Sequence, residues 1–216
     1  MTELGPSVRT HYAGDRCPDG HTGTQMVVSD IIASEKVCLR CHLSKRRISV
    51  VPYCGPDHPR ILFVGEAPGT QEDAQGIPFV GPAGKILRAA ITKLHLKSED
   101  YAITNVLKCH PPFNAFDDEA ARTCLEWLDV EIASARPSLI VALGRNAARS
   151  LLTITVSIMK DSGTLYQNDS CRHGIPVFLC MHPAATLHAE GNRKIWNASI
   201  TSLETHLGTI LGKTTP

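Results

Sequence analysis

Short runs of β-branched and other apolar residues alternate with longer stretches of helical period from Arg60 onward. Four apolar runs predict buried strands, at residues 61–64, 101–107, 139–143 and 177–181. In three other segments, apolar residues recur every three or four positions and predict one apolar helix face each, within 86–94, 120–132 and 196–210. This alternation predicts a three-layer α/β/α domain around a central, mostly parallel, four-stranded sheet.

The polar composition of the N-terminal segment and the capping residues of one predicted helix indicate where these parts begin and end. Residues 1–36 are polar and Gly-rich without a sustained period, so we expect a poorly structured N-terminal extension, followed by a single domain over 37–216. Asp117 and Asp118 suit the N-terminal cap and first turn of the second helix, and Arg136-Pro137 suits its end.

Polar segments without helical period follow three of the predicted strands. They begin at Glu66, Asn105 and His182. In open α/β sheets, ligands bind in the crevice beyond the carboxyl ends of the strands. We therefore expect these three segments to meet in one site.

Composition and charge exclude several classes of protein. The chain has 216 residues, 43% hydrophobic and 20% charged, which is ordinary globular usage and excludes a disordered or fibrous protein. No uncharged apolar stretch reaches the roughly 18 residues of a membrane span, and the N-terminus lacks a secretory pattern, so we expect a cytoplasmic protein. With a formal net charge of +1, contact with nucleic acid would require a local basic patch.

Two glycine-rich segments lie between the first predicted strand and the first predicted helix. GEAPGTQED at 65–73 follows a buried strand, and GIPFVGPAG at 76–84 precedes a helix. Glycines allow the backbone to approach a ligand closely, although the first segment alone is equally typical of an ordinary turn.

The whole run GEAPGTQEDAQGIPFVGPAGK resembles the first motif of the family 4 uracil-DNA glycosylases, the iron-sulfur type of bacteria and archaea. The same resemblance holds, in the same order, for TNVLKCHPP at 104–112, RPSLIVALGRNAARSLL at 136–152 and MHPAATL at 181–187. It covers about residues 37–205. It implies a monomeric base-excision-repair hydrolase of the prokaryotic cytoplasm and nucleoid. Such an enzyme removes uracil from single- or double-stranded DNA and leaves an abasic site.

Eight cysteines are many for a reducing compartment, where clustered cysteines often hold metal. Four of them match the cluster ligands of the family and would form a structural [4Fe–4S] site: Cys38, Cys41, Cys109 and Cys124. A Cys₄ zinc site has the same ligand chemistry and is the main alternative. Cys17 with His21 is a further possible source of ligands, whereas Cys180 lies in an apolar strand and suits the core.

The resemblance also implies a pocket for a base that has been swung out of the helix. Phe79 is the expected stacking face, and the Asn105 amide is the expected reader because it can donate to uracil O4 and accept from N3–H. Ala67 and Pro68 complete the uracil-binding set. Without the resemblance, core packing of Phe79 and a strand-end turn at Asn105 would be the better interpretations.

Cleavage needs donors for the charge that develops on the leaving uracil, and an anion or water near the sugar. His182 is the expected donor to O2, together with backbone N–H groups of the Glu66–Gly69 turn. Glu66 and Asn114 are expected to position sugar or water, and Glu72 to shape the loop. Ala67 stands where the better-known uracil glycosylases have an aspartate that handles the water.

Basic residues near these motifs are candidates for phosphate contacts, although charge runs are usually solvated surface. They are Lys45, Arg46, Arg47, Lys85, Arg88, Arg193 and Lys194. Family members often have arginines where Ala115 and His188 stand here. The Arg-rich insertion of a covalently trapping relative is absent, because residues 113–116 lead directly into a helix.

Two other functions remain open from the sequence. One is a cluster-containing nucleic-acid-binding protein of the same fold without turnover. The other is a glycosylase for a different deaminated or modified base.

Overall fold

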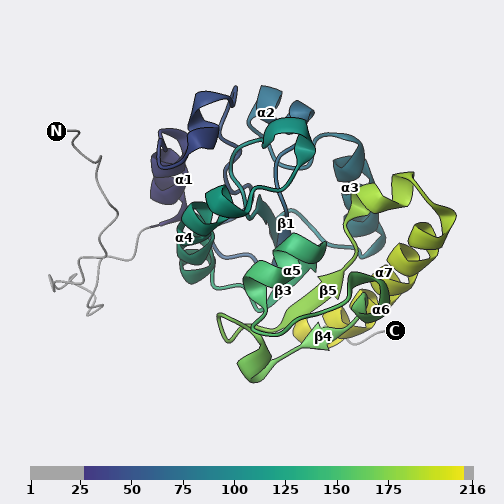
Figure 1. The fold of residues 1–216 in the computed structure, drawn as a ribbon. Coiled ribbons are helices and arrows are strands. Elements are labelled where there is room, and N and C mark those ends of the chain that lie inside the picture. The colour runs from purple at the N-terminus through teal and green to yellow at the C-terminus, as the bar shows by residue number, and fades with distance from the viewer. Residues whose placement is uncertain (1–26, 212–216) are drawn as a thin grey trace, which may run out of the picture.

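The computed structural model describes residues 27–211, and its centre is a five-stranded sheet in the order β2-β1-β3-β5-β4 (Figure 1). Four strands run parallel: β1 (Ile61–Gly65), β2 (Tyr101–Asn105), β3 (Leu139–Leu143) and β5 (Val177–Cys180). The predicted mostly parallel α/β/α architecture is confirmed. The prediction of four strands is wrong by one, because β4 (Leu165–Tyr166) adds an antiparallel edge strand that is too short to show an alternation.

Side chains alternate across the sheet and build two hydrophobic clusters. Leu62, Val64 and their neighbours pack with α4 (Asp118–Ala135) and α5 (Arg145–Leu151). Ile61, Phe63 and their neighbours pack with α3 (Pro82–Lys93) and α7 (Glu190–Leu211). The helices therefore form the two outer layers on opposite faces of the sheet (Figure 1).

The expectation of an unstructured segment up to residue 36 is wrong for its last part. Residues Val28–Lys36 form helix α1, which packs against α4 and buries Val28, Ile31 and Glu35. Only two of these three positions are apolar, so the segment shows no hydrophobic period. Cys17 and His21 lie outside the described residues.

Helix ends follow the capping signals. The Asp117 side chain accepts a hydrogen bond of 2.8 Å from the Ala120 N–H, as predicted for the cap of α4. Arg136 ends that helix in a left-handed conformation, with φ 47°. The shorter helices are α2 (Thr70–Gln75), α6 (Ile158–Asp161), η1 (His42–Lys45), η2 (Pro112–Asn114), η3 (Asn168–Ser170) and η4 (Pro183–Leu187). Over residues 27–211, no helix is both long and apolar enough to span a membrane.

The carboxyl ends of the parallel strands bring the polar loops together. Gly65 at the end of β1 pairs in register with Asn105 at the end of β2. Gly144 directly follows β3, and its N–H donates to the carbonyl of Cys180 at the end of β5. His182 lies two residues after Cys180. The three polar segments predicted to meet do so along this edge.

Candidate active site

A cavity of about 580 Å³ opens at this edge. Its lining includes seven of the residues expected from the sequence to bind uracil or to act in catalysis: Glu66, Ala67, Pro68, Phe79, Asn105, Asn114 and His182. They come from the loops after β1, β2 and β5 and from the glycine-rich segment before α3. This cavity is therefore the candidate active site.

One wall of the cavity pairs an aromatic ring with an amide. Phe79 is buried and has a φ of 54°, and its ring centroid lies 6.0 Å from that of His182. A Cβ atom at Gly65 would lie 2.3 Å from Asn105 Oδ1 and 2.6 Å from the Phe79 ring, so only glycine leaves room for both. Asn105 is buried, and its Oδ1 has no hydrogen-bond partner among the described residues. A buried amide oxygen without a partner is suited to a ligand that donates a hydrogen bond.

His182 is held in one tautomer beside this wall. Its Nδ1 accepts a hydrogen bond of 3.3 Å from the Ala184 N–H, so in the neutral ring the proton is on Nε2. Desolvation by burial lowers the pKa of His182, against the smaller raising effects of Glu66 and Glu72. The neutral His182 ring therefore has its N–H donor at Nε2.

The Glu66 carboxylate is fixed by a residue that the sequence analysis missed. Asn146, at the start of α5, donates to Glu66 from its backbone N–H at 3.2 Å and from its side-chain amide at 3.0 Å. Gly144 has a φ of 98°, and a Cβ there would lie 2.4 Å from Glu66 Oε1. The signal was available, because Gly144 and Asn146 directly follow a buried strand at the same sheet edge.

Glu72 connects the two glycine-rich segments. Its carboxylate accepts hydrogen bonds from the Gly69 N–H at 3.2 Å and the Gly81 N–H at 2.7 Å. The side chain therefore fixes the distance between the loop after β1 and the start of α3.

Residues of η2 and η4 also line the cavity. Asn114 has a φ of 54°, and its Oδ1 lies 2.9 Å from His110 Nε2, a partner that the sequence analysis did not anticipate. On η4, Leu187 is exposed and, with His188, lines the candidate active site.

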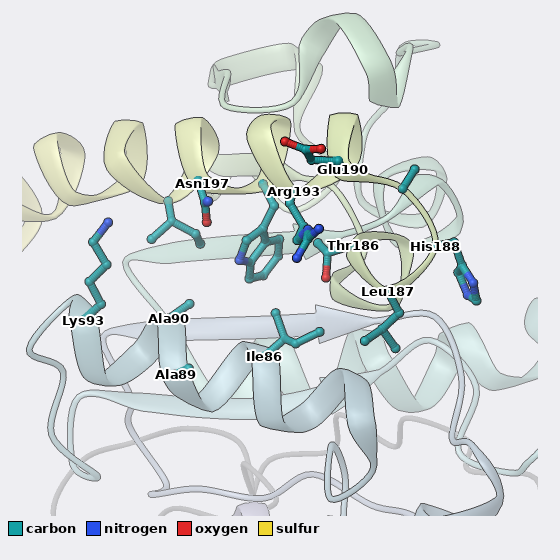
Figure 2. Close-up of a pocket in the computed structure, with 13 residues that line it drawn as sticks. Ile86, Ala89, Ala90, Lys93, Thr186, Leu187, His188, Glu190, Arg193 and Asn197 are labelled. Carbon is teal, nitrogen blue, oxygen red and sulfur yellow. The ribbon is translucent and has the colours of Figure 1, made fainter.

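A neighbouring cavity of about 650 Å³ lies between α3, η4 and α7 (Figure 2). Leu187 and His188 line both cavities, so the two are adjacent. Arg193 projects from α7 into the second cavity, and Lys93 stands at its far end on α3 (Figure 2). None of the expected uracil-binding residues lines it.

The four cysteines of the expected cluster lie in one neighbourhood. Cys41 and Cys124 share a hydrogen bond, which lowers the pKa of Cys41 and is the main reason that the pKa of Cys124 is raised. Burial raises the pKa of Cys109 to about 11, against the lowering effect of the Arg47 charge and with smaller raising effects of Cys41 and Cys38. Among the described residues, no three His, Cys, Asp or Glu side chains form a group close enough for a single metal ion. Cys180, by contrast, is fully buried in the core, as predicted.

Two N–H donors surround these thiols. Arg47 Nη1 lies 3.6 Å from Cys109 Sγ, and its Nη2 donates to the Cys38 carbonyl at 2.6 Å. Trp127 Nε1 lies 3.4 Å from Cys38 Sγ. Hydrogen bonds to the ligand sulfurs are a usual feature of iron-sulfur sites, so these residues fit such a group. Arg47, which was also expected to contact DNA phosphate, thus has its guanidinium next to the cysteine segment.

The other expected phosphate contacts are exposed. Lys45 and Arg46 lie next to the cysteine segment, Lys85 and Arg88 on α3, and Arg193 on α7. Lys194 is also exposed, but its amino group lies 3.9 Å from Glu190, one helical turn away.

Comparison with known proteins gives a consistent result. Residues 51–202 match the model of the uracil DNA glycosylase superfamily. The chain is 34% identical to a type-4 uracil-DNA glycosylase of Archaeoglobus fulgidus, over 88% of this chain and 96% of the relative. It is 40% identical to the type-4 enzyme of Saccharolobus solfataricus, over 77% of this chain and 80% of the relative. A Thermotoga maritima type-4 enzyme is 38% identical over 74% and 84%.

Proposed function

Because this chain belongs to the type-4 uracil-DNA glycosylases of the uracil DNA glycosylase superfamily, we propose that it swings uracil out of DNA and hydrolyses its N-glycosidic bond in the cavity at the sheet edge. The product is DNA with an abasic site, the first intermediate of base excision repair. The observation that carries the proposal is the buried, unpartnered Asn105 Oδ1 beside the Phe79 ring.

Recognition of the base follows from the groups on this wall. The Asn105 amide accepts from uracil N3–H and donates to O4, while Phe79 stacks on the ring. Ala67 and Pro68, on the loop after β1, enclose the base. Cytosine presents a donor at N4 and no hydrogen at N3, so it would leave the buried amide mispaired.

His182 acts on the leaving group. When the bond between C1′ and N1 breaks, its electron pair moves onto uracil, and negative charge develops at O2. The Nε2–H of neutral His182 donates to that oxygen, together with backbone N–H groups of the Glu66–Gly69 turn. A neutral donor suits this role because it keeps its proton when the uracil anion leaves.

Glu66 and Asn114 act on the sugar and the water. The fixed carboxylate of Glu66 stabilises positive charge on the sugar and accepts the proton of the water that adds to C1′. Asn114, which also lines the cavity, orients that water. This assigns to Glu66 the task of the aspartate that Ala67 replaces, while Glu72 shapes the loop.

The cysteine set fits a [4Fe–4S] cluster held by Cys38, Cys41, Cys109 and Cys124. When bound, the cluster supplies a structural crosslink and no redox step. The four residues connect the segment after α1, the loop after β2 and helix α4. Binding would therefore stabilise the loop that contains Asn114.

Phosphate contacts are assigned to exposed basic groups, namely Lys45, Arg46, Lys85, Arg88 and Arg193, with Lys194 beside its Glu190 partner and the half-buried Arg47 beside the cysteine segment. We further propose that the protein acts as a monomer on the DNA of the prokaryotic nucleoid. The proposed bond cleavage depends on neither the phosphate contacts nor the monomeric state.

A panel of DNA substrates tests the proposed function. The purified protein should release the base from oligonucleotides that contain uracil, and leave those with thymine or hypoxanthine intact. Tight binding of uracil DNA without release would favour a binding protein, and preferential release of hypoxanthine would favour a glycosylase for another base. Either result would overturn the proposal.

A further inference from the structure

Phe113 is an aromatic side chain that the fold leaves almost entirely in solvent. It is 97% exposed, and the other described phenylalanines, Phe63, Phe79, Phe116 and Phe178, are buried or half-buried. Nothing in the described part of the chain packs over its ring. A single exposed apolar residue is ordinary in itself, so the backbone and the position of Phe113 carry the argument.

The backbone at this position is unfavourable for a bulky residue. Phe113 has φ 58° and ψ 20°, and Asn114 follows with φ 54°, so two consecutive residues are left-handed. This conformation is a genuine outlier for a large side chain, and such strain concentrates at functional sites. A turn made only to connect β2 and α4 would favour glycine here.

The loop keeps this geometry because its backbone is tied on both sides. Pro111 and Pro112 restrict φ, the Asn114 N–H donates to the Pro111 carbonyl at 3.2 Å, and the Ala115 N–H donates to the Pro112 carbonyl at 3.1 Å. His110 holds the Asn114 side chain at 2.9 Å. The ring is thus presented by a fixed turn.

Its neighbours place the backbone of Phe113 at the edge of the candidate active site. Pro111 and Asn114 both line the cavity, and consecutive Cα atoms are about 3.8 Å apart. When uracil swings into the cavity, the bases that flank it lose a stacking partner. An aromatic ring at the mouth can replace that partner.

We propose that Phe113 stacks on a base that flanks the flipped uracil in the same strand, and so stabilises the opened DNA. The inference rests on the proposed function and adds a residue that contacts the substrate outside the base pocket. Stacking of an aromatic side chain on a base is tolerant of sequence, so Phe113 should strengthen binding without selecting the flanking base.

The test measures binding to oligonucleotides that contain 2′-fluoro-2′-deoxyuridine, which resists hydrolysis at C1′. Phe113→Ala should weaken binding by about 5- to 150-fold, and Phe113→Trp should retain it. In a second set of oligonucleotides, one flanking base at a time is replaced by an abasic analogue. With the correct base removed, wild type and Phe113→Ala should bind equally, because the contact is then lost in both.

Met159→Ala is the matched control, because Met159 is also an exposed apolar residue, 56% exposed on α6. It should bind all the oligonucleotides like wild type. The proposal is overturned if Phe113→Ala binds like wild type, or if its loss of affinity is the same whether or not either flanking base is present. Because the readout is binding, failure of the wild type to release uracil would count against the proposed function alone.

Discussion

The amino group of Lys108 lies 2.7 Å from a carboxylate oxygen of Glu131, and the exposed fractions of the two side chains are 2% and 0%. Lys108 also donates to the Thr104 hydroxyl at 2.6 Å and to the Asn105 carbonyl at 2.8 Å. Burial, and then the charge of Glu131, raise the pKa of the nearby Glu35 on α1. This buried network connects α1 and α4 to the backbone of Asn105, the residue proposed to read the base.

Breaking the pair should destabilise the protein strongly. Lys108→Met leaves the Glu131 carboxylate buried without its cation, so we expect the free energy of unfolding to fall by about 3–5 kcal/mol. Urea denaturation measures this change. Adding Glu131→Leu should restore much of the stability, because the stranded charge is then gone. A double variant no more stable than the single one would show that the pairing is not the cause.

The pH dependence of cleavage reports on His182. Its lowered pKa means that the ring stays neutral below the ordinary histidine value of about 6.5. The single-turnover rate constant should therefore stay level as the pH falls through 6.5 and decline only at lower pH. His182→Ala should lower the plateau by about 10²-fold or more. An acid limb centred at or above pH 6.5 would contradict a neutral donor.

Metal analysis separates a cluster from zinc. Freshly purified protein should contain iron and sulfide and absorb broadly in the visible range. Cys38→Ser and Cys109→Ser should lose the iron and much of the stability, because the free energy of cluster binding is lost. Cys54→Ser is the control, since Cys54 is exposed and outside the cysteine set. Zinc without iron or sulfide would refute the cluster.

The salt dependence of binding tests the basic run after the CxxC pair. Lys45→Gln with Arg46→Gln should weaken DNA binding regardless of the base, and flatten the slope of log K against log salt by about 0.9 per lost duplex phosphate contact. The single-turnover rate at saturating DNA should not change. An unaltered slope would show that Lys45 and Arg46 are solvated surface residues that make no phosphate contact.

Much of the fold was predictable because its signals are local. The four parallel strands each stand out as an apolar run, and the helices α3, α4 and α7 each show a hydrophobic period in the sequence. Helix α1 was missed because Glu35 is buried through its contact with Glu131, a partner 96 positions away. Strand β4 was missed because its two residues pair only through tertiary contact with β5.

The residues of the candidate active site also fall into two groups, those that the sequence predicted and those that it did not. Residues within recognisable motifs, such as Phe79, Asn105 and His182, do line one cavity. Residues that act through a contact with another segment were not found from the sequence, because the distance in space is set by the fold. Asn146 fixes Glu66 across 80 positions, and Arg47 reaches Cys109 across 62.

The most direct test of the account is single-turnover release of uracil from a uracil-containing oligonucleotide by the wild-type holoenzyme and by Asn105→Asp. A carboxylate cannot donate to uracil O4, so the variant should lose at least about 10²-fold in rate, by the scale for losing one donor to the reacting group. It should still bind DNA, since phosphate contacts are unchanged. Equal rates for the two proteins, or a parallel loss of DNA binding and cleavage, would contradict the claim that the Asn105 amide reads the flipped base.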